Sequence, residues 1–216
     1  MKRKKATLSQ IFCAKIMKAS EKDSEKFYKK RKKRLFSKIK NKSIVLEIGP
    51  GTGINLSYYP RGIKWIGIEP NQEMHKFLRE KAQGIGVNAD LKEGISEKLE
   101  IKSNSVDYVI STLVLCSVNN LFDTLKEIKR VLKKGGKFIF IEHVAGKKGT
   151  LRCHIQKIMP LTPWRFFSNG CDPARNIEKA IKEAGFSRIE IENYMQKGKG
   201  IIHLIAKPHI SGLAVK

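Results

Sequence analysis

Apolar residues near the start of the chain recur at intervals of three and four, which is the spacing of one face of an α-helix. Leu8, Ile11, Phe12 and Ile16 begin this pattern, and lysines separate the apolar residues that follow. The pattern predicts a helix over residues 8–40. Three roles fit such a helix: packing on the domain that follows, closing a site as a lid, or lying on a membrane as a basic amphipathic helix.

After residue 43, short apolar runs alternate with stretches of helical periodicity. This alternation is typical of an open, mostly parallel α/β sheet with helices on both faces. We therefore expect a basic helical segment at 1–42 and one α/β domain at 43–216. The predicted strands are 44–48, 64–68, 85–89, 106–112, 137–141 and 188–193, with a seventh at either 201–206 or 210–215. The predicted helices are 70–83, a second from 121 to the glycines at 135 and 136, and a third that ends before Gly185.

The third of these helices has clear boundary signals. Asp172 is a good N-cap residue, and Pro173 fits the first helical position. Gly185 follows the last apolar position, where glycine often ends a helix. The segment 144–171 that precedes this helix is less regular.

Three glycines at alternate positions follow the first predicted strand. Gly49, Gly51 and Gly53 allow the backbone to pass close to a ligand, with a helix N-terminus behind them. The second strand ends in Glu69, whose carboxylate can accept hydrogen bonds from both hydroxyls of a ribose. The loop has the spacing G-x-G-x-G, which differs from the dinucleotide motif, and no P-loop lysine follows it. Together, the loop and Glu69 indicate an adenosine-bearing ligand.

Several runs resemble known families. VLEIGPGTG (45–53), IEPN (68–71), GISEKLEIKSNSVDYV (94–109) and RVLKKGGKFIFIEHV (130–144) together resemble class I S-adenosylmethionine-dependent methyltransferases. KKRKKRLFSKIK (29–40), STLVLCSV (111–118), IEHV (141–144), SNGCDPAR (168–175) and KPHISGLAVK (207–216) resemble the methyltransferase-like protein 7 family, the alkyl thiol S-methyltransferases.

The resemblance implies a Rossmann-like sheet of seven strands, S-adenosyl-L-methionine as cofactor, and a small-molecule acceptor that is a thiol. It favours 210–215 as the last strand. Animal members of the family carry an apolar N-terminal anchor, whereas this sequence has a basic amphipathic segment. We therefore expect a cytoplasmic protein that makes, at most, peripheral contact with an anionic membrane through residues 1–40.

The resemblance also implies which residues bind the cofactor. Pro50 and the three glycines line its methionine and ribose side, Glu69 holds the ribose, and Thr112 lies beside the sulfonium. Pro70 flanks the adenine, which also contacts Ile95 and the backbone near Ser96, because Ile95 stands where the class often has an acid. Tyr28 either closes over the cofactor or anchors the first helix. The expected cofactor-binding residues are Gly49, Pro50, Gly51, Gly53, Glu69, Pro70, Ile95, Ser96 and Thr112.

Methyl transfer from a sulfonium is an in-line displacement, so the enzyme chiefly supplies alignment and desolvation. A thiol acceptor must be presented as its thiolate. His143 follows the fifth strand, and we expect it to act as a general base or thiolate stabiliser, or else to be a loop histidine held by hydrogen bonds. Residues 144–171 are expected to cap the substrate, with Trp164, Phe166 and Arg175 in contact with it, although the aromatic residues could instead plug the core.

The charge of the chain is strongly basic. There are 44 Lys and Arg against 20 Asp and Glu, a net charge of +24, and residues 1–42 alone carry +14. Such an excess attracts anionic membranes, nucleic acid or phosphorylated metabolites, or it serves solubility. No nucleic-acid motif or interleaved aromatic residue accompanies the basic run, so we expect no nucleic-acid partner. Two alternatives to a thiol methyltransferase stay open: methylation of a membrane lipid amine or quinone, and a nucleic-acid-binding protein with a vestigial methyltransferase fold.

The four cysteines give no site from sequence alone. No pair among Cys13, Cys116, Cys153 and Cys171 has metal-ligand or redox spacing, and no secretory signal precedes them. We expect reduced thiols in a cytosolic compartment and no metal site. No apolar run approaches the roughly 20 residues that a membrane span needs.

Overall fold

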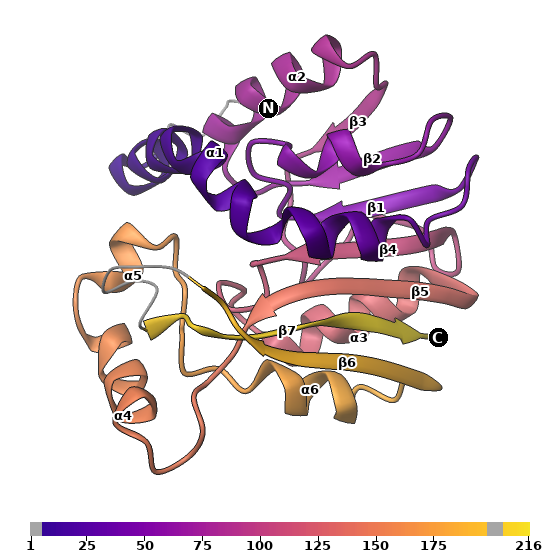
Figure 1. Ribbon diagram of the computed structural model, residues 1–216. Coiled ribbons are helices and arrows are strands. Elements are labelled where there is room, and N and C mark those ends of the chain that lie inside the picture. Colours follow the sequence, from indigo (N-terminus) through magenta and orange to yellow (C-terminus); the bar gives the residue numbers. More distant parts are fainter. Residues whose placement is uncertain (1–5, 198–204) are drawn as a thin grey trace.

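Seven strands form one sheet in the order β3-β2-β1-β4-β5-β7-β6 (Figure 1). The computed structural model describes residues 6–197 and 205–216. The described strands run parallel except β7, which is antiparallel to both of its neighbours. The fold class expected from the sequence is confirmed. The strands are β1 Ile44–Ile48, β2 Lys64–Ile68, β3 Ala89–Lys92, β4 Val106–Thr112, β5 Leu132–His143, β6 Arg188–Met195 and β7 Pro208–Val215.

Helices cover both faces of this sheet. Because successive side chains of a strand point to opposite faces, Val45 packs with α1 and α2 while the adjacent Leu46 packs with α3 and α6. Both faces are therefore apolar, which explains the near-continuous apolar runs of the central strands. The α-helices are α1 Leu8–Phe36, α2 Gln72–Gly84, α3 Leu121–Val131, α4 Leu151–Ile158, α5 Trp164–Phe167 and α6 Ile177–Glu183, and two 3₁₀ helices are η1 Ile54–Tyr58 and η2 Met159–Leu161.

The order of the strands determines where a ligand can bind. β1 lies between β2 and β4. After β1 the chain adds β2 and β3 on one side of it, and then returns to add β4 and β5 on the other side. Such a reversal leaves a crevice at the carboxyl ends of the two central strands. Here those ends lead into residues 49–53 and 113–117.

Two strand predictions need correction. The third strand is Ala89–Lys92, not 85–89, because the residues after α2 complete the end of that helix: the Ile85 and Val87 amides donate to carbonyls of its last turn, and Gly86 has a φ of +68°. β5 begins at Leu132, directly after α3, because Leu132 pairs with Val106 of β4. The glycines at 135 and 136 therefore lie inside the strand and do not end the helix.

Other helix boundaries also differ from prediction, and α2 begins at Gln72 rather than at residue 70. Asp172 does not cap α6; its carboxylate accepts the Ala174 amide at 2.9 Å in a turn, and Asn176 is the N-cap instead. α1 ends at Phe36, four residues before the predicted boundary.

The last strand is β7, as the resemblance favoured, and residues 201–204 of the alternative lie outside the described residues. The segment 144–171 is largely helical, since it contains α4, η2 and α5.

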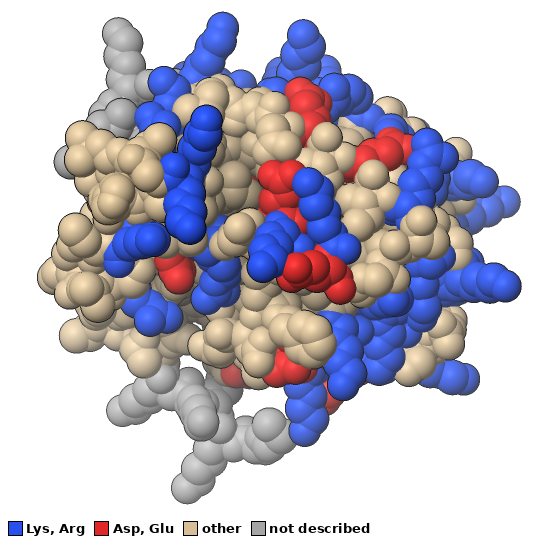
Figure 2. Space-filling view, turned by 90° about the horizontal axis from the view of Figure 1, so that it is seen from below, with Lys and Arg blue, Asp and Glu red and all other residues tan. Residues whose placement is uncertain are grey.

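Basic side chains are spread widely over the surface. Figure 2 shows one face on which Lys and Arg greatly outnumber Asp and Glu. In the described part of the chain, no helix combines the length and the apolar character that crossing a membrane requires.

Candidate active site

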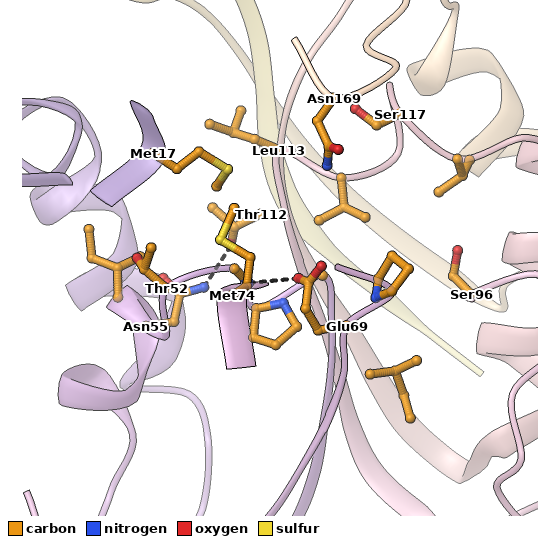
Figure 3. Close-up of a pocket in the computed structure, with 18 of the residues that line it drawn as sticks. Met17, Thr52, Asn55, Glu69, Met74, Ser96, Thr112, Leu113, Ser117 and Asn169 are labelled. Atoms are coloured by element: carbon orange, nitrogen blue, oxygen red, sulfur yellow. Dashed lines mark hydrogen bonds between the residues drawn. The ribbon is translucent and has the colours of Figure 1, made fainter. Parts of the chain in front are cut away.

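A cavity of about 470 Å³ opens at the carboxyl ends of the central strands. Its walls come from the glycine loop, the ends of β2 and β4, helix α1 and residues 168–170. Figure 3 shows Met17, Glu69, Thr112 and Asn169 around this space, each from a different one of these segments. The cavity thus lies at the crevice that the strand order creates.

Most of the predicted cofactor residues line the cavity. Gly53 does not line the cavity. A Cβ at this position would meet the side chains of Leu56 and Leu78 at 3.1 Å, so Gly53 allows close packing behind the loop. The residues that do line the cavity are Gly49, Pro50, Gly51, Glu69, Pro70, Ile95, Ser96 and Thr112.

The glycine loop has a backbone conformation that favours glycine. Gly49 and Gly51 have φ angles of +57° and +56°, in the left-handed region. A Cβ on Gly49 would lie 2.6 Å from the Val114 side chain, so the loop after β4 passes directly against it. The Gly49 amide also donates to the Ile68 carbonyl at 2.8 Å, which fixes the loop to the end of β2.

Glu69 joins the two halves of the expected nucleoside site. It is only 4% exposed, and its carboxylate accepts the Gly51 amide at 3.0 Å and the Asn71 amide at 2.9 Å. Burial raises the pKa of this carboxyl, and the two hydrogen bonds partly oppose that rise. Each carboxylate oxygen can accept a further hydrogen bond, which gives Glu69 capacity for two ribose hydroxyls.

A second buried carboxylate orders the floor of the site. Glu47, in the middle of β1, accepts hydrogen bonds from Asn55 at 2.8 Å, Tyr59 at 2.7 Å and Trp65 at 3.0 Å. Burial raises its pKa. Asn55 also donates to the Thr112 hydroxyl at 3.1 Å, so this network fixes Thr112 at the cavity. The sequence analysis did not identify Glu47 or Asn55, although an acid inside an apolar strand was a visible signal.

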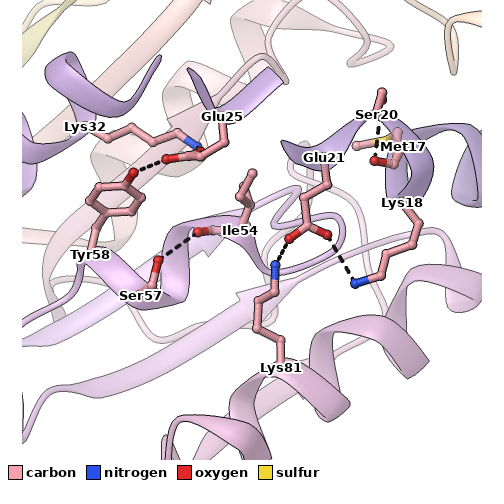
Figure 4. Close-up of polar contacts among 10 residues, drawn as sticks. All are labelled: Met17, Lys18, Ser20, Glu21, Glu25, Lys32, Ile54, Ser57, Tyr58 and Lys81. Atoms are coloured by element: carbon pink, nitrogen blue, oxygen red, sulfur yellow. Dashed lines mark hydrogen bonds and ion pairs between the residues drawn. The ribbon is translucent and has the colours of Figure 1, made fainter. Parts of the chain in front are cut away.

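Helix α1 forms a wall of the cavity. It also packs on the domain through polar contacts with η1 and α2 (Figure 4). Glu21 pairs with Lys81 of α2 and with Lys18, the latter at 3.2 Å. Glu25 accepts hydrogen bonds from Tyr58 of η1 and from Lys32, whose side chain is almost fully buried. These contacts fix α1 against η1 and α2, so packing on the domain is one role of this helix.

Tyr28 lines the cavity and is hydrogen-bonded to a histidine. Its hydroxyl lies 3.0 Å from Nε2 of His209, and both side chains are buried. Nδ1 of His209 lies 3.1 Å from the Lys207 carbonyl oxygen, which can only accept a hydrogen bond. Nδ1 therefore carries the proton, and Nε2 accepts from Tyr28. Burial, and after it the nearby Tyr194, raises the pKa of Tyr28.

His143 does not line the cavity. It is 5% exposed, and its Nε2 lies 3.1 Å from Sγ of Cys171. Cys116 is close enough that the sulfur and nitrogen atoms of the three residues lie within 4.8 Å of one another. A hydrogen bond from Cys171 holds the pKa of the Cys116 thiol well below its usual range. The spacing of the cysteines in the sequence gave no sign of this cluster.

The predicted substrate residues lie outside the cavity wall. The Trp164 indole donates to the Cys171 carbonyl at 3.0 Å, and Phe166 is 48% exposed. Arg175 donates to the carbonyls of Leu115 and Val118 at 2.9 and 2.6 Å, so its guanidinium satisfies the backbone after β4. Residues 168–170 of the same segment line the cavity instead.

Comparison with known proteins agrees with this geometry. A family described as a methyltransferase domain matches residues 46–140. Human thiol S-methyltransferase TMT1A is 34% identical over 198 residues, which are 86% of this chain and 78% of the relative. Thiol S-methyltransferase TMT1B of Rattus norvegicus is 36% identical over 204 residues, covering 88% and 81%. The crystal structure of a SAM-dependent methyltransferase from Aquifex aeolicus has the same fold, with a TM-score of 0.66, 18% identity and coverage of 94% and 97%.

Proposed function

The chain belongs to the class I S-adenosylmethionine-dependent methyltransferases, in the family that includes TMT1A and TMT1B, and we propose that its methyl acceptor is a small thiol. The enzyme uses S-adenosylmethionine and methylates a small molecule. Two features support a thiol. The relatives carry the name thiol S-methyltransferase, and the Tyr28–His209 hydrogen bond at the cavity wall offers a path for a thiol proton.

The residues present fit S-adenosylmethionine, which supplies an electrophilic methyl group on a sulfonium when bound. Glu69 would hold the ribose, because its carboxylate is fixed by two amides and retains acceptor capacity. Gly49 and Gly51 would let the backbone approach the methionine portion without a side chain in the way. Thr112, fixed by Asn55, would lie beside the sulfonium end.

The Tyr28–His209 pair would take the proton of the acceptor. The thiol S–H donates to the Tyr28 oxygen while the Tyr28 proton passes to Nε2 of His209, which becomes an imidazolium. Nδ1–H of that imidazolium stays hydrogen-bonded to the Lys207 carbonyl. The sulfur, now a thiolate, would displace the sulfonium at the methyl carbon, so that the new S–C bond forms as the methyl–sulfonium bond breaks and S-adenosylhomocysteine leaves. The proton would later leave His209 to solvent.

The test compares Tyr28→Phe with the wild type on a series of small thiols of increasing pKa. We expect kcat/KM of the variant to fall by about 10²- to 10⁴-fold for thiols of high pKa, which is the usual contribution of general base catalysis. The loss should shrink for thiols that are already ionised in solution.

Tyr194→Phe is the matched control, because its ring also packs against His209, at 5.4 Å between centroids, yet Tyr194 does not line the cavity. Equal activity of Tyr28→Phe and wild type on every thiol would contradict the role of the pair. Methylation of phosphatidylethanolamine or a quinone, with none of any thiol, would overturn the proposed acceptor.

We also propose peripheral contact with an anionic membrane. Apolar side chains are exposed where α1 meets α5: Leu8 is 80% exposed, Phe167 is 54% exposed, and the rings of Phe12 and Phe167 lie 5.6 Å apart. Two exposed lysines, Lys15 and Lys18, follow Phe12 along α1. Leu8→Ser should reduce flotation with phosphatidylserine-containing vesicles, whereas Phe122→Ser, at an exposed position on α3, should not. Equal flotation of the two variants would contradict the proposal.

A further inference from the structure

Three side chains with metal-binding atoms converge behind the cavity. Cys116 follows β4, His143 ends β5, and Cys171 precedes α6. Their sulfur and imidazole nitrogen atoms lie within 4.8 Å of one another, and all three residues are buried. The methyl-transfer reaction proposed above uses none of them.

Few protein groups compete for these atoms. His143 Nε2 contacts the Cys171 sulfur at 3.1 Å, and within the described residues Nδ1 has no hydrogen-bond partner. Outside the cluster, the contacts of the Cys116 sulfur with described residues are long ones, to the Ser117 hydroxyl at 3.5 Å and the Leu113 carbonyl at 3.9 Å. Both cysteines otherwise belong to the apolar core on this face of the sheet. Nε2 has no hydrogen-bond partner outside this cluster among the described residues, so a metal ion would not have to displace one.

We propose that Cys116, His143 and Cys171 bind one zinc ion. Two cysteines and one histidine with an open fourth position are an established zinc ligand set. Zinc–sulfur bonds of about 2.3 Å and zinc–nitrogen bonds of about 2.0 Å place tetrahedral ligand atoms roughly 3.5–3.8 Å apart. The separations here, from 3.1 Å up to 4.8 Å, bracket that range, so small side-chain rotations bring the three atoms around one ion.

Charge favours zinc over a monovalent ion such as copper(I). Two thiolates and a neutral imidazole around a divalent cation sum to zero, whereas the same ligands around a monovalent cation leave one negative charge. A net negative charge is costly in a buried site, and more so here because the buried Glu142 carboxyl interacts with both Cys116 and His143. The neutral combination is therefore the one that this position accommodates best.

The ion would join two parts of the cavity wall. Ser117 and Gly170, each adjacent to one of the cysteines, both line the cavity. A metal bridge between Cys116 and Cys171 would hold the loop after β4 against residues 168–170. The site would thus stabilise this part of the cavity wall, without contact to the methyl donor.

The test measures zinc in the purified full-length chain, in a non-thiol reductant, with neither S-adenosylmethionine nor an acceptor present. Zinc content after dialysis should be about one ion per chain in the wild type and in Cys153→Ser, which removes a buried cysteine outside the cluster. Cys171→Ser should bind zinc at least 10-fold more weakly. Added zinc should raise the thermal midpoint of the metal-free wild type and leave that of Cys171→Ser unchanged.

Cobalt(II) gives a readout that needs no variant. Bound to the wild-type chain, it should produce the sulfur-to-cobalt charge-transfer absorption of thiolate ligation, and zinc should abolish it. The absence of this absorption, or equal zinc binding by Cys171→Ser, would overturn the proposal. Because neither assay contains a methyl donor, a failure here leaves the proposed methyl transfer untouched.

Discussion

Glu69→Gln tests whether the Glu69 carboxylate binds the ribose of the methyl donor. The wild-type carboxylate can accept both ribose hydroxyls while it accepts the amides of Gly51 and Asn71. Glutamine has one acceptor oxygen, so at least one charge-assisted hydrogen bond to the ribose is lost. A hydrogen bond to a charged group contributes about 1.5–3 kcal/mol, so we expect binding to weaken by about 10- to 150-fold.

The assay is isothermal titration with S-adenosylhomocysteine, which cannot react, and with its 2′-deoxy analogue. If Glu69 binds the ribose, removing the 2′-hydroxyl should weaken binding by the wild type. It should weaken binding by Glu69→Gln much less, because the two groups are coupled, as a double-mutant cycle would show. Glu80→Gln, at an exposed position on α2, is the control and should bind as the wild type does.

The substitution also has a structural cost that must be separated from binding. One of the two backbone amides loses its acceptor, which lowers the free energy of unfolding by about 1–3 kcal/mol. Urea unfolding measures this loss directly. Binding of S-adenosylhomocysteine by folded Glu69→Gln within twofold of the wild type would refute the role of the carboxylate.

Three further predictions concern Glu69 and the glycine loop. Burial raises the pKa of Glu69, so donor affinity should fall with decreasing pH at a pH above the ordinary glutamate value of 4.5, while Glu69→Gln binds independently of pH over that range. Because the pKa of Glu69 is higher in the folded than in the unfolded chain, protonation of this carboxyl favours folding. Its contribution to the free energy of unfolding is therefore complete below pH 4.5 and is lost as the pH rises through the pKa of the folded state. Gly49→Ala should lower the free energy of unfolding in urea by at least about 2 kcal/mol, because it combines left-handed strain with a 2.6 Å approach to Val114. Gly62→Ala, with a φ of +77° but open space around it, should lose only the strain, and equal losses for the two variants would contradict the packing argument.

Local signals in the sequence were sufficient to place the glycine loop and Glu69 at one cavity. The glycine loop and Glu69 are close in sequence, and their meaning depends on short-range geometry, so the structure brings them together as expected. Boundaries were less predictable where two signals competed. Asp172 and Asn176 are both good caps, and only the tertiary position of α6 selects Asn176.

The proposed acceptor side depends on contacts that no local pattern contains. Tyr28 and His209 meet although 181 positions separate them in the chain. Arg175 was expected to touch substrate, yet it satisfies two carbonyls of the loop after β4, because those buried carbonyls need a donor. The same applies to Cys116 and His143, which only the strand order places beside each other.

A crystal structure with S-adenosylhomocysteine tests the donor site most directly. The ribose hydroxyls should lie within hydrogen-bond distance of the Glu69 carboxylate, with the sulfur near Thr112 and the backbone of Gly49–Gly51 along the amino-acid portion. Ligand density elsewhere on the chain, or a nucleoside in the cavity with its ribose turned away from Glu69, would contradict the account.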